Sequence, residues 1–408
     1  MLKFLWALVL HLSILSGTTS LAVQNDSLSS PQARGLEHSS TSGQILAPKV
    51  FIFSMFDPEA DVWYNIPEFN LTARTIPVPG FSPLFPDAHC TDDGSVCQLT
   101  MGEGEINAAV TVSSLVRSSL FDLTETYFLI AGIAGISPKF GTTGSVTFAR
   151  YAVQVSLQYE LDAREIPSNF TTGYVPQGTR APGQYPTEIY GTEVFEINDA
   201  LRKAAFDFAK NATLNDTDVA IAYRKNYVSD PSFAPAAQSP SVVLCDTATS
   251  DTFWLGTLLA EAFENTTTLF TNNTATYCTT QQEDNATLEA LLRGATCGLV
   301  DFSRIIIMRT ASDFDRPPPG QASADGLDLS ISGGFPPSIT NLYLAGVKVV
   351  EGIVREWDDR FKTGIKPTNY VGDIFGSLGG TPDFGPGSKF EGKGGAKKNL
   401  KKRSRRAF

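Results

Sequence analysis

The chain has 408 residues, 42% of them hydrophobic, and a formal net charge of −11 at pH 7. This length is enough for one large domain or two small ones, and the acidic balance excludes a general affinity for nucleic acid and other polyanions. Three histidines are too few for a histidine-rich metal site, so we expect no metal and no cofactor.

The first 22 residues have the pattern of a secretory signal peptide. Lys3 precedes an apolar run over residues 4–15, and the small residues Ser20 and Ala22 follow at the spacing of a cleavage site. A signal anchor is the alternative, but the run is interrupted by polar residues and is shorter than the roughly 20 residues of a spanning helix. We therefore expect cleavage near Ala22 and a secreted or lumenal protein.

A Ser-rich leader, expected to be disordered, follows at residues 23–48, and one domain is expected at residues 49–362. No later stretch is long and apolar enough to cross a bilayer. Eight Asn-x-Ser/Thr sequons agree with passage through the secretory pathway, although chance supplies some of them. They are Asn25, Asn70, Asn169, Asn211, Asn215, Asn265, Asn272 and Asn285.

The five cysteines also agree with an oxidising compartment. Cys90 and Cys97 bracket a short turn-like segment, while Cys245 and Cys278 both lie among polar residues that look exposed. We expect a Cys90–Cys97 bridge and a Cys245–Cys278 bridge, with Cys297 free. Five unpaired thiols are the alternative.

Segments with strand and helix patterns alternate along the expected domain. Strands are expected at residues 50–53, 97–101, 127–131, 145–148, 242–244 and 305–308. Helices are expected at residues 106–116, 195–208, 254–263, 286–292 and 342–361. This order predicts an α/β fold with a mixed, mostly parallel sheet, covered by helices on both faces and binding ligands at the carboxyl ends of its strands.

Acidic residues and glycines follow several of these strands. They include Asp57, Glu59, Gly102, Gly104, Gly132, Gly135, Asp251, Glu283 and Asp284. The last strand pattern, "IIIMRTASDFDR" at residues 305–316, leads directly into Asp313 and Asp315. An unpaired carboxylate is costly at the end of a core strand, so the placement of Asp313 requires a reason.

Two explanations for Asp313 are open. As part of a site, Asp313 would be a general acid whose pKa is raised by neighbouring carboxylates such as Asp315 and Glu59. As a structural residue, it would form an ion pair with Arg309 or Arg316, and its pKa would fall.

The Gly/Lys-rich tail at residues 363–408 is expected to be disordered and basic. From Lys389 onward it carries a net charge of +8. Because the whole chain carries −11, the residues before Lys389 carry −11 − 8 = −19. The tail is either a solubilising end, a dibasic processing site or a binder of phosphate groups. The basic segment "KKNLKKRSRRAF" at residues 397–408 has no aromatic residue before Phe408, so stacking on nucleic acid bases is unsupported.

Four segments together resemble the purine nucleoside permease family of fungi: "GEGEINAA", "GIAG", "QEDNATLEA" and "RTASDFDRPPP". The resemblance covers about residues 49–361. That family is distantly similar to nucleoside phosphorylases and to methylthioadenosine-type nucleosidases. The resemblance therefore implies a nucleoside phosphorylase-like fold and a purine nucleoside as ligand.

The looser similarity to the nucleosidases implies roles for single residues. Glu59 matches the carboxylate that activates water, and Ser312-Asp313 matches a Ser-Asp pair whose aspartate protonates the purine. Phe253 matches a base-stacking aromatic, and Glu283-Asp284 matches the ribose-binding pair imperfectly. The expected substrate-binding set is completed by Gly132, Gly135 and Arg309.

Two of these assignments have a structural alternative. Phe253 lies beside Trp254 at a predicted helix start, where an aromatic pair is usually part of the core. Glu283 and Asp284 also suit the acidic first turn of a helix, which the helix dipole favours.

Two functions from different classes follow. The first is a nucleoside-binding component of an uptake system, with a membrane transporter as partner. The second is a secreted N-ribosyl hydrolase; phosphorolysis is less favoured because residues 102–115 contain no Lys or Arg for phosphate. A storage protein that kept the fold without the chemistry is a third option, and a homo-oligomer is compatible with all three.

Overall fold

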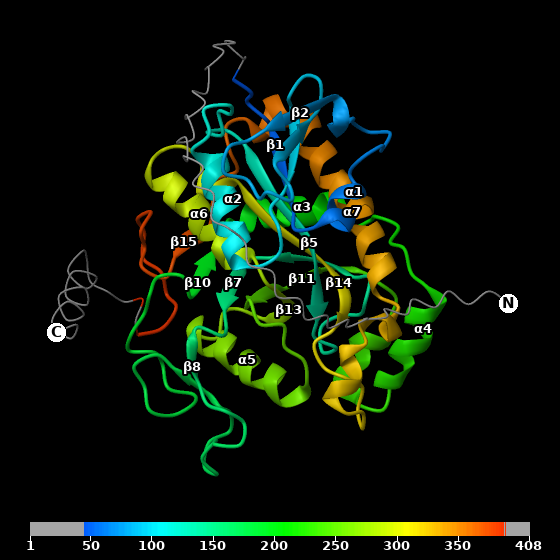
Figure 1. Cartoon of the computed structure of the whole chain (residues 1–408), viewed down its shortest axis with the longest axis vertical. Helices are drawn as coiled ribbons and strands as arrows, with labels where there is room; N and C mark the ends of the chain where they lie inside the picture. The colour runs from blue at the N-terminus through cyan, green and yellow to red at the C-terminus, as the bar shows by residue number, and fades with distance from the viewer. Residues whose placement is uncertain (1–44, 387, 389–408) are drawn as a thin grey trace, which may run out of the picture. The chain divides into compact units, whose positions relative to one another are not determined.

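The computed structural model describes residues 45–386 and residue 388 (Figure 1). The expected signal peptide, most of the expected leader and the basic end of the tail lie outside the described residues. The longer helices are α1 (Asp57–Asp61), α2 (Glu105–Val116), α3 (Asp199–Ala209), α4 (Asp218–Arg224), α5 (Thr257–Phe270), α6 (Asp284–Thr296) and α7 (Phe335–Arg355). Over the described ranges, none of the helices combines the length and apolarity needed to cross a membrane.

The described strands form one large sheet and a separate two-stranded ribbon. They are β1 (Val50–Ser54), β2 (Arg74–Pro77), β3 (Asp87–Cys90), β4 (Val96–Thr100), β5 (Tyr127–Ile136), β6 (Val146–Ala149), β7 (Tyr151–Gln154), β8 (Gln158–Glu160), β9 (Tyr174–Pro176), β10 (Val194–Glu196), β11 (Val242–Leu244), β12 (Asp246–Thr249), β13 (Tyr277–Gln281), β14 (Ile305–Phe314) and β15 (Gly372–Asp373). Strands β8 and β9 form the ribbon.

The centre of the large sheet is mixed, with parallel pairs around β1 and β5 and antiparallel pairs where β13 joins β5 and β6 joins β14. Its order is β15-β10-β7-β12-β13-β5-β1-β4-β3-β2, with β14, β6 and β11 branching from β5. Strand β1 runs parallel to β4 and β5, and β14 runs parallel to β5. Antiparallel pairs lie at both ends, where β2 joins β3 and β10 joins β15. The expected α/β fold with a mixed sheet is confirmed.

Alternate residues of the central strands point to opposite faces of the sheet, and each face is covered by helices (Figure 1). On one face, Phe51 and Phe53 pack in a cluster that includes residues of α2 and α6. On the other, Val50 and Ile52 pack in a cluster that includes residues of α3 and α7. Burial on both faces is why the central strands are almost continuously apolar.

Strands β5 and β14 are longer than the sequence pattern predicts. Each runs for ten residues and continues through the glycine or polar segment that was expected to follow it. Every residue of β14 is buried, including Arg309 and Asp313. Arg309, Ser312 and Asp313 therefore lie within a strand, whose backbone geometry fixes their positions.

Two threonine-containing strands, β12 and β13, were not predicted. Their sequences, "DTAT" and "YCTTQ", are polar in composition, but threonine is β-branched and favours strands. The residues around Cys245 and Cys278 look exposed in the sequence, but β12 and most of β13 are buried, and the two cysteines are 3% and 0% exposed. The expected helix from residue 195 also begins later, because β10 occupies its start and Asn198 caps α3.

The domain extends beyond both expected boundaries. After residue 362 the chain forms β15, and Ile374 and Phe384 are buried in a cluster with Tyr151 and Phe263. Before residue 49, Leu46 is buried and forms a bridge with Phe121. Residues 363–386 therefore belong to the packed domain, contrary to the expectation of a disordered tail from 363.

Both expected disulfides are present in the structure. Cys90–Cys97 links β3 to β4 across an antiparallel pair, and Cys245–Cys278 links the residue before β12 to β13. Cys297 is free and exposed. The two bridges close loops with sequence separations of 7 and 33 residues.

These separations predict unequal effects when the bridges are removed. Replacing Cys245 and Cys278 with alanine should lower the free energy of unfolding by about 4 kcal/mol, against about 2 kcal/mol for Cys90 and Cys97, because a longer loop restricts the unfolded chain more. Urea unfolding of both double variants checks the order, with Cys297→Ala as a control that should change little. Equal losses from both bridges would contradict the loop-length argument.

Candidate functional site

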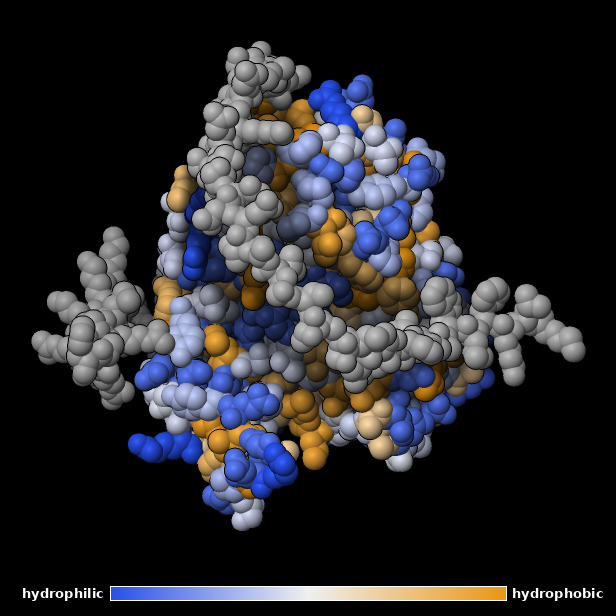
Figure 2. Space-filling model, viewed as in Figure 1, coloured by the Kyte–Doolittle hydropathy of each residue, from blue (hydrophilic) through white to orange (hydrophobic). Residues whose placement is uncertain are grey.

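A cavity of about 740 Å³ lies at the carboxyl ends of the central strands. The space-filling view shows hydrophobic and hydrophilic residues meeting around a hollow in the face that carries α1, α2 and α5 (Figure 2). The cavity is lined by Met55, Phe56, Glu59, Glu103, Ile133, Ala134, Gly135, Thr217, Val219, Phe253, Thr280, Gln281, Gln282, Glu283, Arg309, Ser312, Asp313, Gly333, Phe335 and Pro336. Its volume is within the usual range for a small-molecule site.

The pairing of β14 with β5 places each long polar side chain of the site opposite a glycine. Arg309 pairs with Gly132, and Asp313 pairs with Gly135 across a register shift at Ser312. A Cβ atom at Gly132 would lie 2.6 Å from Arg309 Nη1 and 3.0 Å from Glu59 Oε1, and one at Gly135 would clash with Thr280 Oγ1. Glycine is therefore required at both positions, because any larger residue would collide with the neighbouring side chains.

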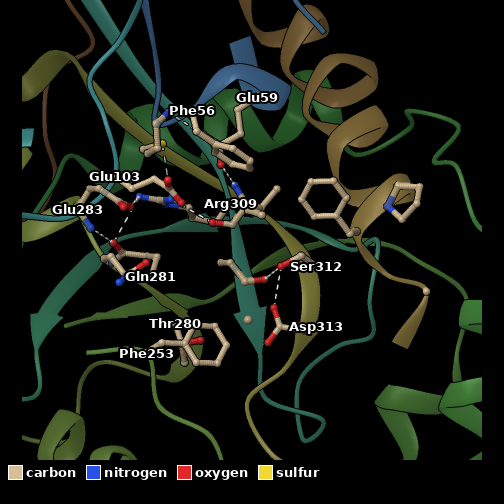
Figure 3. Close-up of a pocket in the computed structure, with 18 of the residues that line it drawn as sticks. Phe56, Glu59, Glu103, Phe253, Thr280, Gln281, Glu283, Arg309, Ser312 and Asp313 are labelled. Atoms are coloured by element: carbon tan, nitrogen blue, oxygen red, sulfur yellow. Dashed lines mark hydrogen bonds and ion pairs between the residues drawn. The ribbon is translucent and has the colours of Figure 1, made fainter. Parts of the chain in front are cut away.

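Arg309 is the charged centre of the site (Figure 3). Its guanidinium donates to Asp284 Oδ1 at 2.6 Å and to Glu283 Oε2 at 3.2 Å, and its Nη1 donates to the carbonyl of Ile133 at 3.1 Å. The three charged side chains are 5% exposed or less. Although burial opposes a charge, the carboxylates of Asp284 and Glu283 raise the pKa of Arg309 above its usual value.

Glu59 lies near Arg309, and both side chains border the space at Gly132. Its two carboxylate oxygens accept the backbone N–H of Met55 at 2.7 Å and that of Ile133 at 2.6 Å. Burial raises the pKa of Glu59 to about 8, against the opposing effects of Arg309 and the two backbone donors. Glu59 is therefore mostly protonated at neutral pH.

Asp313 has a different environment, without a positive partner. Its Oδ1 accepts the hydroxyl of Ser312 at 2.7 Å, while Arg309 pairs with Glu283 and Asp284, and Arg316 pairs with Asp315. Neither of the ion pairs considered for Asp313 is therefore formed. Burial, with the nearby charge of Asp315 adding to it, raises the pKa of Asp313 to about 6 although the Ser312 hydroxyl opposes the rise.

Phe253 and Thr280 lie together at one side of the cavity in the close-up view (Figure 3). Phe253 is 49% exposed, whereas Trp254 is 5% exposed and packs edge-on against Phe263. The core member of the aromatic pair is therefore Trp254, and the face of Phe253 is available to the cavity.

The amino terminus of α2 already carries carboxylates from within the protein. Glu283 Oε1 accepts the N–H of Gly104 at 3.0 Å, and Asp251 Oδ1 accepts the N–H of Glu105 at 2.6 Å. A helix amino terminus is an attractive place for an anion, because its N–H groups and its dipole both favour negative charge. At α2 these amide groups are occupied, which disfavours phosphate there.

Most of the expected site residues meet at this cavity. Those that line it are Glu59, Gly135, Phe253, Glu283, Arg309, Ser312 and Asp313. Asp284 is fully buried on the far side of Arg309, and Gly132 lies against the Arg309 and Glu59 side chains without lining the cavity. Asp284 is therefore placed to hold Arg309, and the sequence expectation that it contacts a ribose does not fit its position.

Several lining residues had no signal in the sequence. Thr217 and Val219 come from the start of α4, and Phe335 and Pro336 from the start of α7. Met55 and Phe56 adjoin the "FDPEAD" segment, so a wider reading of that segment could have found them. The α4 and α7 residues reach the cavity only through the tertiary fold.

Asn285 follows Asp284 at the start of α6 and is 1% exposed. Its side-chain oxygen accepts the hydroxyl of Thr249 at 2.6 Å, and its amide donates to the carbonyl of Thr192 at 2.8 Å. The residue thus links α6 to β12 and to the loop before β10.

The Arg309 cluster gives a stability prediction with an internal control. Arg309→Met keeps much of the side-chain volume but leaves Glu283 and Asp284 without their cation, so the free energy of unfolding should fall by about 3–5 kcal/mol. Arg293→Met removes the ion pair with Glu289, which has the same 2.6 Å separation but an Arg293 side chain that is 66% exposed. That change should cost less than about 1 kcal/mol. Chemical denaturation of both variants measures the difference, and similar losses would contradict it.

Two solved structures align with most of this chain at low sequence identity. A 5'-methylthioadenosine/S-adenosylhomocysteine nucleosidase from Neisseria meningitidis aligns with 74% of this chain and 98% of its own, at a TM-score of 0.44 and 15% identity. The futalosine hydrolase of Helicobacter pylori aligns with 75% of this chain and 98% of its own, at a TM-score of 0.45 and 14% identity.

Relatives in sequence are much closer. A purine nucleoside permease of Candida albicans is 48% identical over 348 residues, which cover 84% of each chain. A protein of Schizosaccharomyces pombe named as a probable purine nucleoside permease is 41% identical over 324 residues, covering 77% of this chain and 91% of its own. The family model for purine nucleoside permeases matches residues 47–366. The chain therefore belongs to the purine nucleoside permease family.

Proposed function

We propose that the protein is a secreted, nucleoside-binding member of this family, and that it supports nucleoside uptake by holding a purine nucleoside in the cavity outside the bilayer. The observation that carries the proposal is the carboxyl group of Asp313, which is buried at the cavity wall without a cation. A protonated carboxyl group can donate to a ring nitrogen of a purine. The two disulfides agree with the secretory route.

The other contacts of the cavity suit the two halves of a nucleoside. Phe253 offers an aromatic face on the same side as Asp313, where a purine ring would stack (Figure 3). Glu283 lies at the opposite end beside Arg309, where its carboxylate would accept ribose hydroxyl groups. The family's link to nucleoside transport supports the same ligand class.

The pKa values favour binding over rapid cleavage. Hydrolysis would require Glu59 ionised as a base and Asp313 protonated as an acid at the same moment. Burial raises the pKa of Glu59 to about 8, so the ionised base that hydrolysis needs is disfavoured at neutral pH. Binding needs the protonated form of Asp313 but does not need Glu59 to be ionised.

Binding should depend on pH through Asp313. Its pKa in the folded protein is about 6, so the donor is present below pH 6 and is lost as the pH rises through that value. We expect nucleoside affinity to fall by up to about tenfold per pH unit above 6. Glu59 stays protonated until about pH 8 and does not contribute to this change.

The variant Asp313→Asn tests whether the pH dependence of nucleoside affinity comes from Asp313. The asparagine amide donates at every pH, so the variant should bind below pH 6 with an affinity close to that of the parent and should lose the pH dependence. Calorimetry with adenosine, guanosine and inosine on both sides of pH 6 provides the measurement. A parent protein with pH-independent affinity, or a variant with the parent's pH slope, would remove Asp313 from the base contact.

A second candidate is an N-ribosyl hydrolase, which is favoured by one observation: Glu59 and Asp313 both line the cavity and both have raised pKa values. Protonation of the departing purine by Asp313 and activation of water by Glu59 would together break the glycosidic bond. Phosphorolysis is disfavoured, because carboxylates occupy the amino terminus of α2.

Product analysis distinguishes the two candidates. We expect the bound nucleoside to be recovered intact after incubation with the protein, and the addition of phosphate to change nothing. Chromatography for free base after incubation with each nucleoside tests this. Release of free base would establish the hydrolase instead, provided that it meets two conditions. Glu59→Gln should abolish it, and its rate should be level between about pH 6 and about pH 8, the pKa values of Asp313 and Glu59.

A further inference from the structure

A series of buried hydrogen bonds connects four residues that lie close to the cavity but do not line it. Asp315 accepts both Nε and Nη2 of Arg316 at 2.9 Å, and its Oδ2 also accepts the hydroxyl of Tyr277 at 2.9 Å. The same hydroxyl accepts the indole N–H of Trp254 at 3.1 Å. All four residues are 5% exposed or less.

This series of hydrogen bonds joins three segments that carry cavity residues. Asp315 lies two residues after Asp313 at the end of β14, and Tyr277 begins β13, which leads to Thr280. Trp254 directly follows Phe253 in the loop before α5. The backbone adds a further link, because the N–H of Gly256 donates to the carbonyl of Asp315 at 3.0 Å.

The loop that carries Phe253 needs such an anchor. Residues 250–256 form neither helix nor strand, and Phe253 itself is half exposed. An aromatic ring on an irregular loop stacks well on a base only when its position is held by neighbouring contacts. The side chain of Trp254 supplies these contacts, by packing on Phe263 and by donating to Tyr277.

We propose that Tyr277 and Trp254 are positioning residues that connect the loop of Phe253 to the strand end of Asp313, and so set the spacing between the base-stacking ring and the base-protonating carboxyl group. The Asp315–Arg316 pair is the fixed point of this connection. Its bidentate geometry and complete burial hold Asp315 in one orientation, to which Tyr277 donates. The proposal deepens the proposed function and rests on it for the role of the spacing.

Tyr277→Phe is the most selective change. It removes one hydroxyl, keeps the ring in the core and leaves the Asp315–Arg316 pair intact. Tyr127→Phe is the matched control, because Tyr127 is also a buried tyrosine in the large sheet, and its hydroxyl donates to the carbonyl of Phe361 at 2.8 Å, away from the cavity. Tyr277→Phe loses a hydrogen bond to a carboxylate and one from the indole N–H of Trp254, whereas Tyr127→Phe loses one to a backbone carbonyl. The control therefore matches the ring and its burial, and it differs in the link to the loop of Phe253.

The first measurement does not require a ligand. Amide hydrogen exchange in the segment 250–256 should become at least about threefold to tenfold faster in Tyr277→Phe, the range expected from the loss of the Trp254–Tyr277 hydrogen bond alone, and should stay at the parent rate in Tyr127→Phe. Unchanged exchange in Tyr277→Phe, or the same increase in both variants, would overturn the proposal.

The second measurement is a double-mutant cycle for nucleoside binding. Phe253→Ala should weaken binding about tenfold. Tyr277→Phe should weaken binding about threefold to tenfold when Phe253 is present and less than about twofold in the Phe253→Ala background, because it acts through that ring. Equal losses in both backgrounds would overturn the positioning role. If the parent binds no nucleoside, the proposed function fails, and the exchange measurement alone decides whether the connection exists.

Discussion

The burial of one guanidinium group makes the rest of the site possible. Arg309 lies in the middle of β14, and two carboxylates from the start of α6 and the residue before it approach it from another part of the chain. Without this cation, Glu283 and Asp284 would be buried negative charges, which a protein interior tolerates poorly. With it, the acidic start of α6 is attached to the central strand. The start of α2 is attached as well, because Glu283 also accepts the N–H of Gly104, the residue before that helix.

Arg309 and Asp313 lie within a strand and not on a loop that follows it. Strands β5 and β14 continue past the point where a sequence reader would end them, and the glycines of β5 make room for the large side chains of β14. Since neighbouring strands hold a fixed separation, Arg309 and Asp313 are held with the precision of the backbone. The same strand presents one residue that must remain charged and another whose charge changes near pH 6.

Much of this could be predicted from local patterns, and the rest depends on contacts that are distant in the sequence. The apolar runs at residues 50–53 and 305–308 located the central strands, and the apolar strand before Asp313 indicated that this residue is buried. The partners of Arg309 could not be predicted, because they lie about 25 residues earlier in the sequence and follow a different strand. The polar strands β12 and β13 were missed because their burial comes from neighbouring elements and leaves no apolar pattern. The packing of residues 363–386 was missed because a segment rich in glycine and proline resembles a linker.

The position of Asn285 has a consequence for how the chain matures. Asn285-Ala286-Thr287 is a glycosylation sequon, yet its asparagine is enclosed between α6 and β12 and uses both ends of its amide. A sugar attached to that nitrogen would remove a donor and could not be accommodated in a space that leaves the residue 1% exposed. If the chain follows the secretory route, folding of the α6 region and oligosaccharide transfer compete for the same side chain. A chain modified at Asn285 before α6 docks would be unable to form the contacts of Asn285 with Thr249 and Thr192.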